Sequence, residues 1–313
     1  MLAGFAESIY ALIKFFNLKD MQSLEILLGN LIDYAGLFPP AALSMTEAVN
    51  NFAAYQKSEK AWMLGRFVVP AYQLSEFGEA ALPHFENETT PLWQVSVLCN
   101  NLNADLEKIA SFNDRYSQQL VVRSIEIKAY DIEIIEQAQT VSGFLPTFFE
   151  VQINDYLHNF LAAISSIESF AKVRTGGITA DAFPDSRQLA KFIKACTDED
   201  VAFKATAGLH HALRGEYPLT YVPDSAKATM HGFLNVFIAA TFAQNGASEE
   251  ELIAILEERS IEAFLFENGS ITWRDKMVVR GHLRNARNLF ALSFGSCSFL
   301  EPIEEVERTV GSR

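Results

Sequence analysis

Cationic side chains alternate with apolar residues in two short segments of the chain. Lys172 and Arg174 are two residues apart, and Lys204 and Thr206 repeat this spacing further along. Residues two apart on a β-strand point to the same face, so each segment predicts a strand with one polar face. A lysine buried beside other cations can lose its proton and act as a nucleophile or a base. These residues are therefore candidates for catalysis.

A double glycine and a predicted helix separate these two strands. Gly176 and Gly177 follow Arg174, and Asp185 and Ser186 are residue types that start helices. Apolar residues at helical spacing come next: Leu189, Phe192, Ile193 and Cys196. One apolar helix face between two strands indicates a β/α/β crossover, and such a crossover joins parallel strands.

The rest of the chain repeats this alternation of strands and helices. Predicted strands lie at 31–38, 62–69, 92–98, 120–129 and 147–153 and around Lys172 and Lys204, with an eighth candidate at 261–267. This number of repeats matches a (β/α)8 barrel, which has about 250 residues. The alternative is an open, doubly wound α/β sheet. The chain lacks the glycine-rich dinucleotide and P-loop motifs of open sheets, so we expect a TIM-like barrel at 28–300 and no cofactor.

The two ends of the chain are predicted to lie outside the barrel. Residues 1–27 would form an N-terminal helical extension, because the apolar stretch 1–16 is too short and too charged to span a membrane. At the other end, the sequence after 290 is expected to be irregular, and 301–313 to be an acidic tail. Cys297 is a second candidate nucleophile if this segment folds over the barrel, although a buried structural cysteine is the commoner outcome.

The segment before this tail is predicted to hold helices and a hairpin. Apolar helices are expected at 225–244 and 247–258, and Asn268-Gly269 is a tight-turn signal that would join the last strand candidate to a partner. A further helix is expected at 278–290. Its basic residues, expected to face solvent, are Arg280, Arg284 and Arg287.

Two earlier predicted strands also carry charge on one face. Glu126 and Lys128 share a face, and Glu150 shares a face with Gln152. The opposite faces are apolar and suited to packing against helices, so the charged faces should point into the barrel. These residues lie toward the C-terminal ends of their strands, where barrel enzymes hold their active sites. The alternative is a purely structural set of ion pairs, since buried charges need partners.

The predicted lumen carries more positive than negative charge. Its cations are Lys128, Lys172, Arg174 and Lys204, and its anions are Glu126 and Glu150. The whole chain has a net charge of −14, so this local excess predicts a small anionic ligand, a phosphate or a carboxylate. Backbone N–H groups at Gly176 and Gly177 would suit such an oxyanion, although a double glycine is also an ordinary turn. Asp33, in the first predicted strand, would complete the lumen.

Composition limits the partners of the protein. The strongly acidic balance argues against nucleic acid and anionic membranes, which both require a basic surface. The cysteines are Cys99, Cys196 and Cys297, which are widely spaced and typical of reduced thiols in the cytoplasm. A homo-oligomer stays possible.

The strand that begins at Lys204 resembles one in a known enzyme family. Lys204-Ala-Thr-Ala-Gly-Leu looks like the lysine strand of class I aldolases of the deoxyribose-phosphate aldolase type, in which the lysine forms a Schiff base. Thr175-Gly-Gly-Ile is similar to the phosphate-binding turn of those barrels. The two segments come in the opposite order here, and aligning the glycines puts Val173, not Lys172, at the family's second lysine. The resemblance therefore implies a (β/α)8 fold and a Schiff-base role for Lys204, but no substrate.

Two adjacent histidines follow the lysine strand. His210 would lie over the proposed site, where it could transfer protons, or it could be a loop residue with one structural hydrogen bond. A metal site would combine two of His210, His211 and His231 with Glu150 or Asp33. Adjacent histidines on an extended chain point apart, and no HxH or HExxH motif is present, so no metal is predicted.

Three functions stay open at this stage. The first is a lyase or aldolase-like enzyme acting on a small anionic carbonyl compound, with Lys204 as the imine or base lysine, Lys172 and Glu150 tuning it, and His210 moving protons. The expected ligand-binding residues are Arg174, Gly176, Gly177, Lys128, Glu126, Thr206, His211 and Asp33. The second is a metal-assisted hydrolase or isomerase. The third is a non-catalytic barrel that binds an anionic metabolite or a protein partner.

Overall fold

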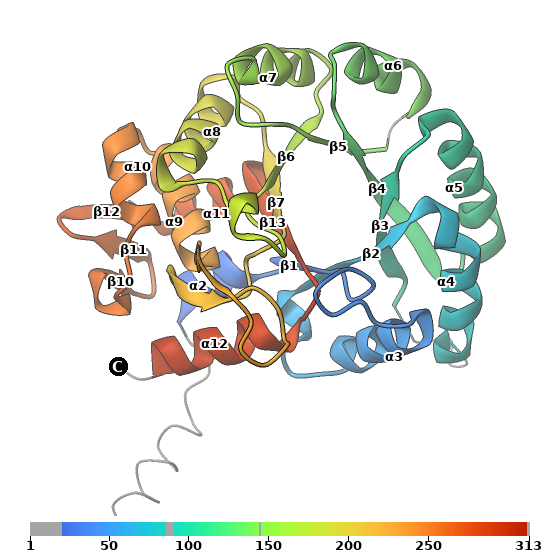
Figure 1. Ribbon diagram of the computed structural model, residues 1–313, viewed down its shortest axis with the longest axis horizontal. Helices are drawn as coiled ribbons and strands as arrows, with labels where there is room; N and C mark the ends of the chain where they lie inside the picture. The colour runs from blue at the N-terminus through green and yellow to red at the C-terminus, as the bar shows by residue number, and fades with distance from the viewer. Residues whose placement is uncertain (1–20, 86–90, 144, 312–313) are drawn as a thin grey trace, which may run out of the picture.

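The computed structural model describes residues 21–85, 91–143 and 145–311. Eight parallel strands close into a barrel in the order β1-β13-β7-β6-β5-β4-β3-β2, with helices around the outside (Figure 1). The predicted (β/α)8 barrel is confirmed. Its strands are β1 (Ile32–Tyr34), β2 (Leu64–Pro70), β3 (Trp93–Cys99), β4 (Leu120–Lys128), β5 (Thr147–Glu150), β6 (Phe170–Arg174), β7 (Phe203–Thr206) and β13 (Ala291–Ser296).

Asp185, which the sequence indicated as a helix start, caps a helix and forms a capping box with Gln188. Capping boxes also join Ser44 to Glu47 at the start of α3 (Met45–Gln56) and Ser248 to Glu251 at the start of α10 (Glu249–Leu256), so each side chain satisfies a free backbone N–H group. The α-helices are α2 (Gln22–Leu28), α3 (Met45–Gln56), α4 (Leu74–Ala81), α5 (Leu102–Tyr116), α6 (Glu133–Val141), α7 (Leu157–Ser166), α8 (Ser186–Asp198), α9 (Phe233–Ala243), α10 (Glu249–Leu256), α11 (Arg280–Leu289) and α12 (Leu300–Gly311). Short 3-10 turns lie at Ala61–Met63, Ala71–Gln73, Leu82–Phe85, Ala180–Ala182 and Ile261–Ala263.

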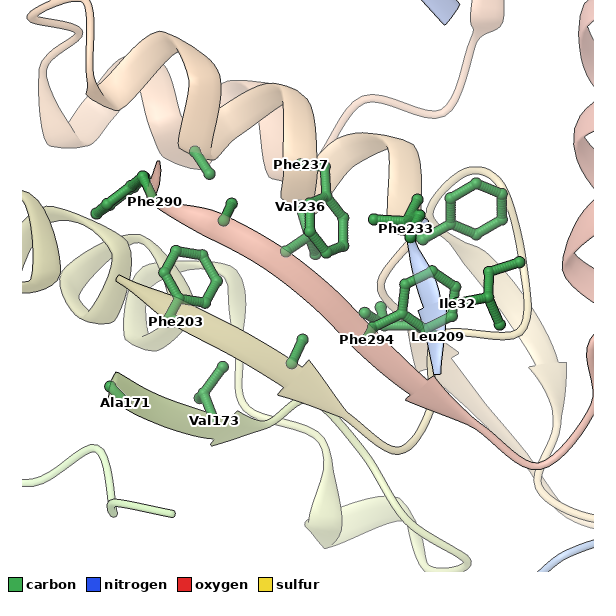
Figure 2. Close-up of a cluster of buried hydrophobic side chains, with 14 of the residues drawn as sticks. Ile32, Ala171, Val173, Phe203, Leu209, Phe233, Val236, Phe237, Phe290 and Phe294 are labelled. Carbon is green, nitrogen blue, oxygen red and sulfur yellow. The ribbon is translucent and has the colours of Figure 1, made fainter. Parts of the chain in front are cut away.

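The core outside β13 is formed largely by α9. Every residue of this helix is buried, as expected of a helix that is apolar on all sides. Figure 2 shows Phe233 and Phe237 of α9 packed against the outer face of β13. The Phe233 ring stacks on Phe294 with 5.5 Å between ring centroids. This packing fixes β13 against the helical layer and leaves its inner face free for the lumen.

The eighth barrel strand is β13, and the prediction at 261–267 was wrong. Part of that segment, β10 (Phe264–Phe266), instead forms an antiparallel sheet with β11 (Ser270–Trp273) and β12 (Lys276–Val279), joined through the predicted Asn268-Gly269 turn. The sequence of β13 does not have the pattern typical of a strand, because the residues that face the lumen have small side chains or none. Ser293 donates a hydrogen bond inside the lumen and Gly295 lines the cavity above it, so no apolar run marks the strand.

Two further predictions near the C-terminus need correction. The expected helix at 225–244 begins only at Phe233, because β8 (Gly215–Pro218) and β9 (Lys227–Met230) pair as an antiparallel hairpin. Burial alternates along β9, and this period of two was missed. The expected irregular acidic tail is mostly helix α12, whose buried residues include Ile303, Val306 and Val310 at helical spacing.

At the N-terminus, the apolar stretch 1–16 lies outside the described residues, and α2 covers the last residues of the predicted extension and ends one residue beyond it. None of the helices in the described ranges is both long enough and apolar enough to cross a lipid bilayer.

Arg287 does not face solvent as the sequence predicted, whereas Arg280 and Arg284 do. The buried guanidinium donates hydrogen bonds from Nε to the Leu27 carbonyl at 2.7 Å and from Nη1 to the Leu292 carbonyl at 3.0 Å. It also contacts the carbonyls of Gly29 and Ala291. Burial lowers the pKa of Arg287 to about 9, although the negative charge of Asp33 acts to raise it. The side chain thus ties the end of α2 to the start of β13.

Replacing Arg287 with alanine should reduce the free energy of unfolding by about 3 kcal/mol, because buried carbonyls lose a charged hydrogen-bond donor. Urea denaturation followed by circular dichroism measures this change. Arg284→Ala, on the exposed side of the same helix, is the matched control and should stay within about 0.5 kcal/mol of the unmodified protein. Equal effects of the two substitutions would show that the carbonyl contacts do not stabilise the fold.

Candidate active site

Five charged side chains form an alternating row inside the barrel. The Nζ of Lys204 lies 2.6 Å from Oδ2 of Asp33 and 2.8 Å from Oε1 of Glu126. The Nζ of Lys172 lies 2.9 Å from Oε2 of Glu126 and 2.9 Å from Oε2 of Glu150. The order is therefore Asp33, Lys204, Glu126, Lys172, Glu150, and Glu126 bridges the two lysines.

The parallel register of the strands brings these residues together. Lys172 of β6 lies opposite Lys204 of β7, and Glu150 of β5 lies opposite Lys172. Their sequence neighbours Val173 and Phe203 are buried in the hydrophobic core that contacts the helices (Figure 2). The alternation seen in the sequence therefore places the charges in the lumen, as expected.

Glu126 and Lys172 both keep their charge because each has two partners. Burial alone would raise the pKa of Glu126, but the charges of Lys172 and Lys204 outweigh it and hold the pKa well below its usual range. The Ser96 hydroxyl adds a hydrogen bond to Glu126 at 2.7 Å. Burial alone would lower the pKa of Lys172, but Glu126 and Glu150 raise it above its usual value. At neutral pH both Glu126 and Lys172 are therefore ionised.

Asp33 lies beneath Lys204 and does not line the cavity, although the sequence suggested a ligand contact. Its carboxylate is 1% exposed and accepts hydrogen bonds from the Arg66 backbone N–H at 2.8 Å and the Ser293 hydroxyl at 2.8 Å. A Cβ atom at Gly65 would lie 2.3 Å from Oδ1 of Asp33, so this strand position requires glycine. The structure gives Asp33 the role of a partner for Lys204.

A cavity of about 840 Å³ opens above this row at the C-terminal end of the barrel. Four members of the row reach its floor, and the sequence-predicted residues above them surround it. Those lining it are Lys204, Lys172, Glu126, Glu150, Lys128, Arg174, Gly177, Thr206, His210 and His211. The site thus coincides with the end of the barrel at which barrel enzymes carry out their reactions.

Gly176 is absent from the cavity lining, although the sequence placed it at an oxyanion. A Cβ atom there would lie 2.9 Å from the Gly208 Cα and 2.4 Å from the Phe183 ring. Gly176 is therefore required for close packing of two turns. Gly177 does line the cavity, where a Cβ atom would lie 3.8 Å from Nη2 of Arg174.

Two cations form a second layer above the paired row. Lys128 and Arg174 lie two residues beyond Glu126 and Lys172 on the same strand faces. Among the residues that the structure describes, neither has a carboxylate within ion-pair distance, and both are exposed to the cavity. Arg174 makes a single long contact, from Nη2 to the Gly176 carbonyl at 3.4 Å. This layer has positive charge available for an anion.

A third group of polar residues meets at the mouth of the cavity. Nδ1 of His210 lies 3.0 Å from Oε2 of Glu301, and the Tyr221 hydroxyl donates to the same oxygen at 2.9 Å. Burial alone would raise the pKa of Glu301, but the hydrogen bonds and charge of His210 and the Tyr221 hydroxyl lower it below its usual value. Burial raises the pKa of Cys297, so this thiol, 3.8 Å from the Tyr221 hydroxyl, stays protonated.

Sequence reasoning missed Tyr221 and Glu301. Tyr221 lies in the loop between β8 and β9, and Glu301 lies in the first turn of α12, beside that loop in Figure 1. The sequence predicts an irregular segment after 290 and no strand or helix around Tyr221, so no periodic pattern drew attention to these polar residues. The only available signal was the helical spacing of apolar residues after Leu300, which would have placed Glu301 at a helix N-terminus.

The other two histidines that the sequence offered as candidates, His211 and His231, have structural contacts. The His211 ring stacks on Tyr217, and its Nδ1 lies 3.8 Å from Oε1 of Glu305, too far for a hydrogen bond. His231 is 1% exposed, with Nε2 2.7 Å from the Pro184 carbonyl, and burial lowers its pKa to about 4. Within the described ranges, no three histidine, cysteine, aspartate or glutamate side chains form a group that could hold a metal ion.

No protein-family model matches this chain, and no curated protein matches its sequence.

Replacing Lys204 with methionine should reduce the free energy of unfolding by about 3–5 kcal/mol, because Asp33 and Glu126 would stay buried without their shared cation. Thermal and urea denaturation measure the loss. Lys128→Met removes a lysine from the layer above and is the control, with an expected change below about 0.5 kcal/mol. A Lys204→Met protein as stable as the control would mean that the lumen row does not depend on this cation.

The ion pairs of Glu126 also predict a pH dependence. Because folding lowers the pKa of Glu126, its contribution to stability is present above the unfolded-state pKa of about 4.3 and disappears as the pH falls through the depressed folded-state value. Lys172→Met should raise that folded-state pKa, so its melting temperature should fall less as the pH drops below about 4.3 and should level off at a higher pH than that of the unmodified protein. Melting curves between about pH 3 and pH 7 test this, and parallel profiles for the two proteins would contradict it.

Proposed function

We propose that this protein is an enzyme that forms or cleaves a carbon–carbon bond next to the carbonyl group of an anionic compound. The observation that carries the proposal is the arrangement of two layers. Lys172 and Lys204 flank Glu126 at the floor of the cavity, and Lys128 and Arg174 lie unpaired above them. The first layer offers amines and carboxylates, and the second offers charge for an anion.

The anionic group of the substrate would bind in the upper layer. Arg174 can form two parallel hydrogen bonds to a phosphate or carboxylate, and Lys128 adds a second positive charge. Gly177 lines the cavity beside this guanidinium, and a Cβ atom there would lie 2.8 Å from the Cβ of Ala182. Binding there would direct the carbonyl group of the same molecule toward the lysines on the floor.

Lys172 is the better placed of the two lysines to react with that carbonyl. Its side chain is 6% exposed, against 1% for Lys204, and its second partner Glu150 lies at the open end of the row. An imine forms when the neutral amine adds to the carbonyl carbon and water leaves. The protonated imine then accepts electrons from the carbon–carbon bond that breaks. Lys204, held by Asp33 and Glu126, would keep Glu126 ionised during these steps.

Proton transfer would use the carboxylates and the histidine at the mouth. Glu150 lies 2.9 Å from the Lys172 amine and can take the proton that the ammonium must lose before it attacks. The raised pKa of Lys172 makes this loss unfavourable in the free protein, so the step would follow substrate binding. His210, oriented by Glu301, is available to exchange a proton with the departing fragment.

Borohydride trapping tests the imine. The protein would be incubated with a panel of phosphorylated aldehydes and oxo acids, reduced, digested and mapped by mass spectrometry. We expect a reduced adduct on Lys172 with the compound that is turned over. Lys172→Met should abolish the adduct and reduce kcat by about 10³-fold or more.

Lys128→Met provides the comparison within the same cavity. It should raise KM with a smaller effect on kcat, because it removes binding energy for the anion and not the reacting amine. An adduct on Lys204 would transfer the role to that lysine. Turnover without an adduct on either residue would overturn the imine mechanism.

The closed row of ion pairs favours a second candidate function. Both lysines of the floor are already neutralised by carboxylates, so the barrel could bind an anion without chemistry. In that case Arg174→Gln would abolish binding of the anion, while Lys172→Met would leave it unchanged and no compound of the panel would be turned over.

A further inference from the structure

A second cavity adjoins the first at the two unpaired cations. It has a volume of about 510 Å³ and lies at the ends of β4, β5 and β6, beside the turn that leads into α8. Four residues line both cavities: Lys128, Glu150, Arg174 and Phe183. An anion held by Lys128 and Arg174 would therefore lie at the junction, with space on both sides.

The two cavities differ in their chemistry. The first has the charged floor of lysines and carboxylates, whereas the second, apart from the shared residues, has a single charged side chain, Asp181. Tyr130 lines the second cavity and is 73% exposed, and its ring makes no contact with another ring or a cation among the described residues. The Gln152 amide also lines it and has no hydrogen-bond partner in the described part of the chain. An open aromatic face and a free amide suit a flat group with hydrogen-bonding edges.

The size of the site points in the same direction. Cavities of about 300–1,000 Å³ enclose ligands of drug size, and the first cavity alone is near the upper end of this range. A phosphorylated compound of three to five carbons would fill a fraction of it and would leave the second cavity unused.

We propose that the second cavity binds a nucleoside-like group that is joined, through a phosphate held by Lys128 and Arg174, to the carbonyl-bearing end of the substrate in the barrel. The inference rests on the proposed function and names its substrate class, a nucleoside phosphate derivative of a carbonyl compound. The base would stack on Tyr130, because aromatic rings bind the faces of all bases with little dependence on which base it is. The Gln152 amide would contact the polar edge of the base.

A matched pair of probes tests this class on the intact protein. Ribose 5-phosphate carries the phosphate and the latent aldehyde, and ADP-ribose adds a nucleoside phosphate to the same sugar phosphate. Isothermal titration calorimetry should show ADP-ribose binding at least tenfold more tightly. Tyr130→Ala should weaken ADP-ribose binding about tenfold and leave ribose 5-phosphate unchanged, whereas Arg174→Gln should weaken both.

Tyr156→Ala is the control, because Tyr156 is a similarly exposed tyrosine that lines neither cavity. It should bind both probes as the unmodified protein does. Equal affinity for the two probes, no binding of ADP-ribose, or equal behaviour of Tyr130→Ala and Tyr156→Ala would overturn the inference. These outcomes are distinct from failure of the proposed function, which is read from turnover and from the adduct on Lys172.

Discussion

Glu126 is the residue on which the lumen depends, because its two carboxylate oxygens bind different lysines. Without it, Lys172 would keep only Glu150 and Lys204 only Asp33, and no carboxylate would separate the two ammonium groups inside the barrel. The bridge also links strands that are distant in sequence, since Glu126 is in β4 and the lysines are in β6 and β7. A slip of one residue in any of these strands would turn its charge toward the helices.

The row of five is not electrically balanced. It begins with Asp33 and ends with Glu150, so three carboxylates enclose two lysines, and the layer above adds two cations that no carboxylate in the described part of the chain pairs. An apolar filling of the lumen could match the stability of such a row, because buried ion pairs lose much of their attraction to desolvation. The row therefore adds little stability that apolar side chains could not supply. An anion bound at the second layer would neutralise the excess positive charge of Lys128 and Arg174.

The sequence predicted those site residues that lie on strands in which polar and apolar residues alternate. Lys172, Arg174, Lys204 and Glu126 alternate with apolar neighbours, and that pattern located the lumen face. The same reasoning failed for β13, where the lumen positions are a serine and a glycine, because small residues leave no pattern. Contacts between distant segments, such as Glu301 with His210, follow from how α12 packs, and spacing along the chain carries no information about them.

The separation of the two layers constrains the proposed substrate. Arg174 is two residues beyond Lys172 on β6 and Lys128 is two beyond Glu126 on β4, which corresponds to about 6–7 Å along each parallel strand, while Lys128 lies opposite Glu150 of the neighbouring strand. In a substrate whose carboxylate is bonded directly to the reacting carbonyl carbon, the two groups are too near each other to contact the two layers at the same time. A phosphate separated from the carbonyl by several bonds spans them, and beyond that phosphate the substrate can extend only where the protein leaves room. The second cavity begins at those same two cations, so the geometry that favours a distant phosphate also leads the remainder of the molecule toward Tyr130.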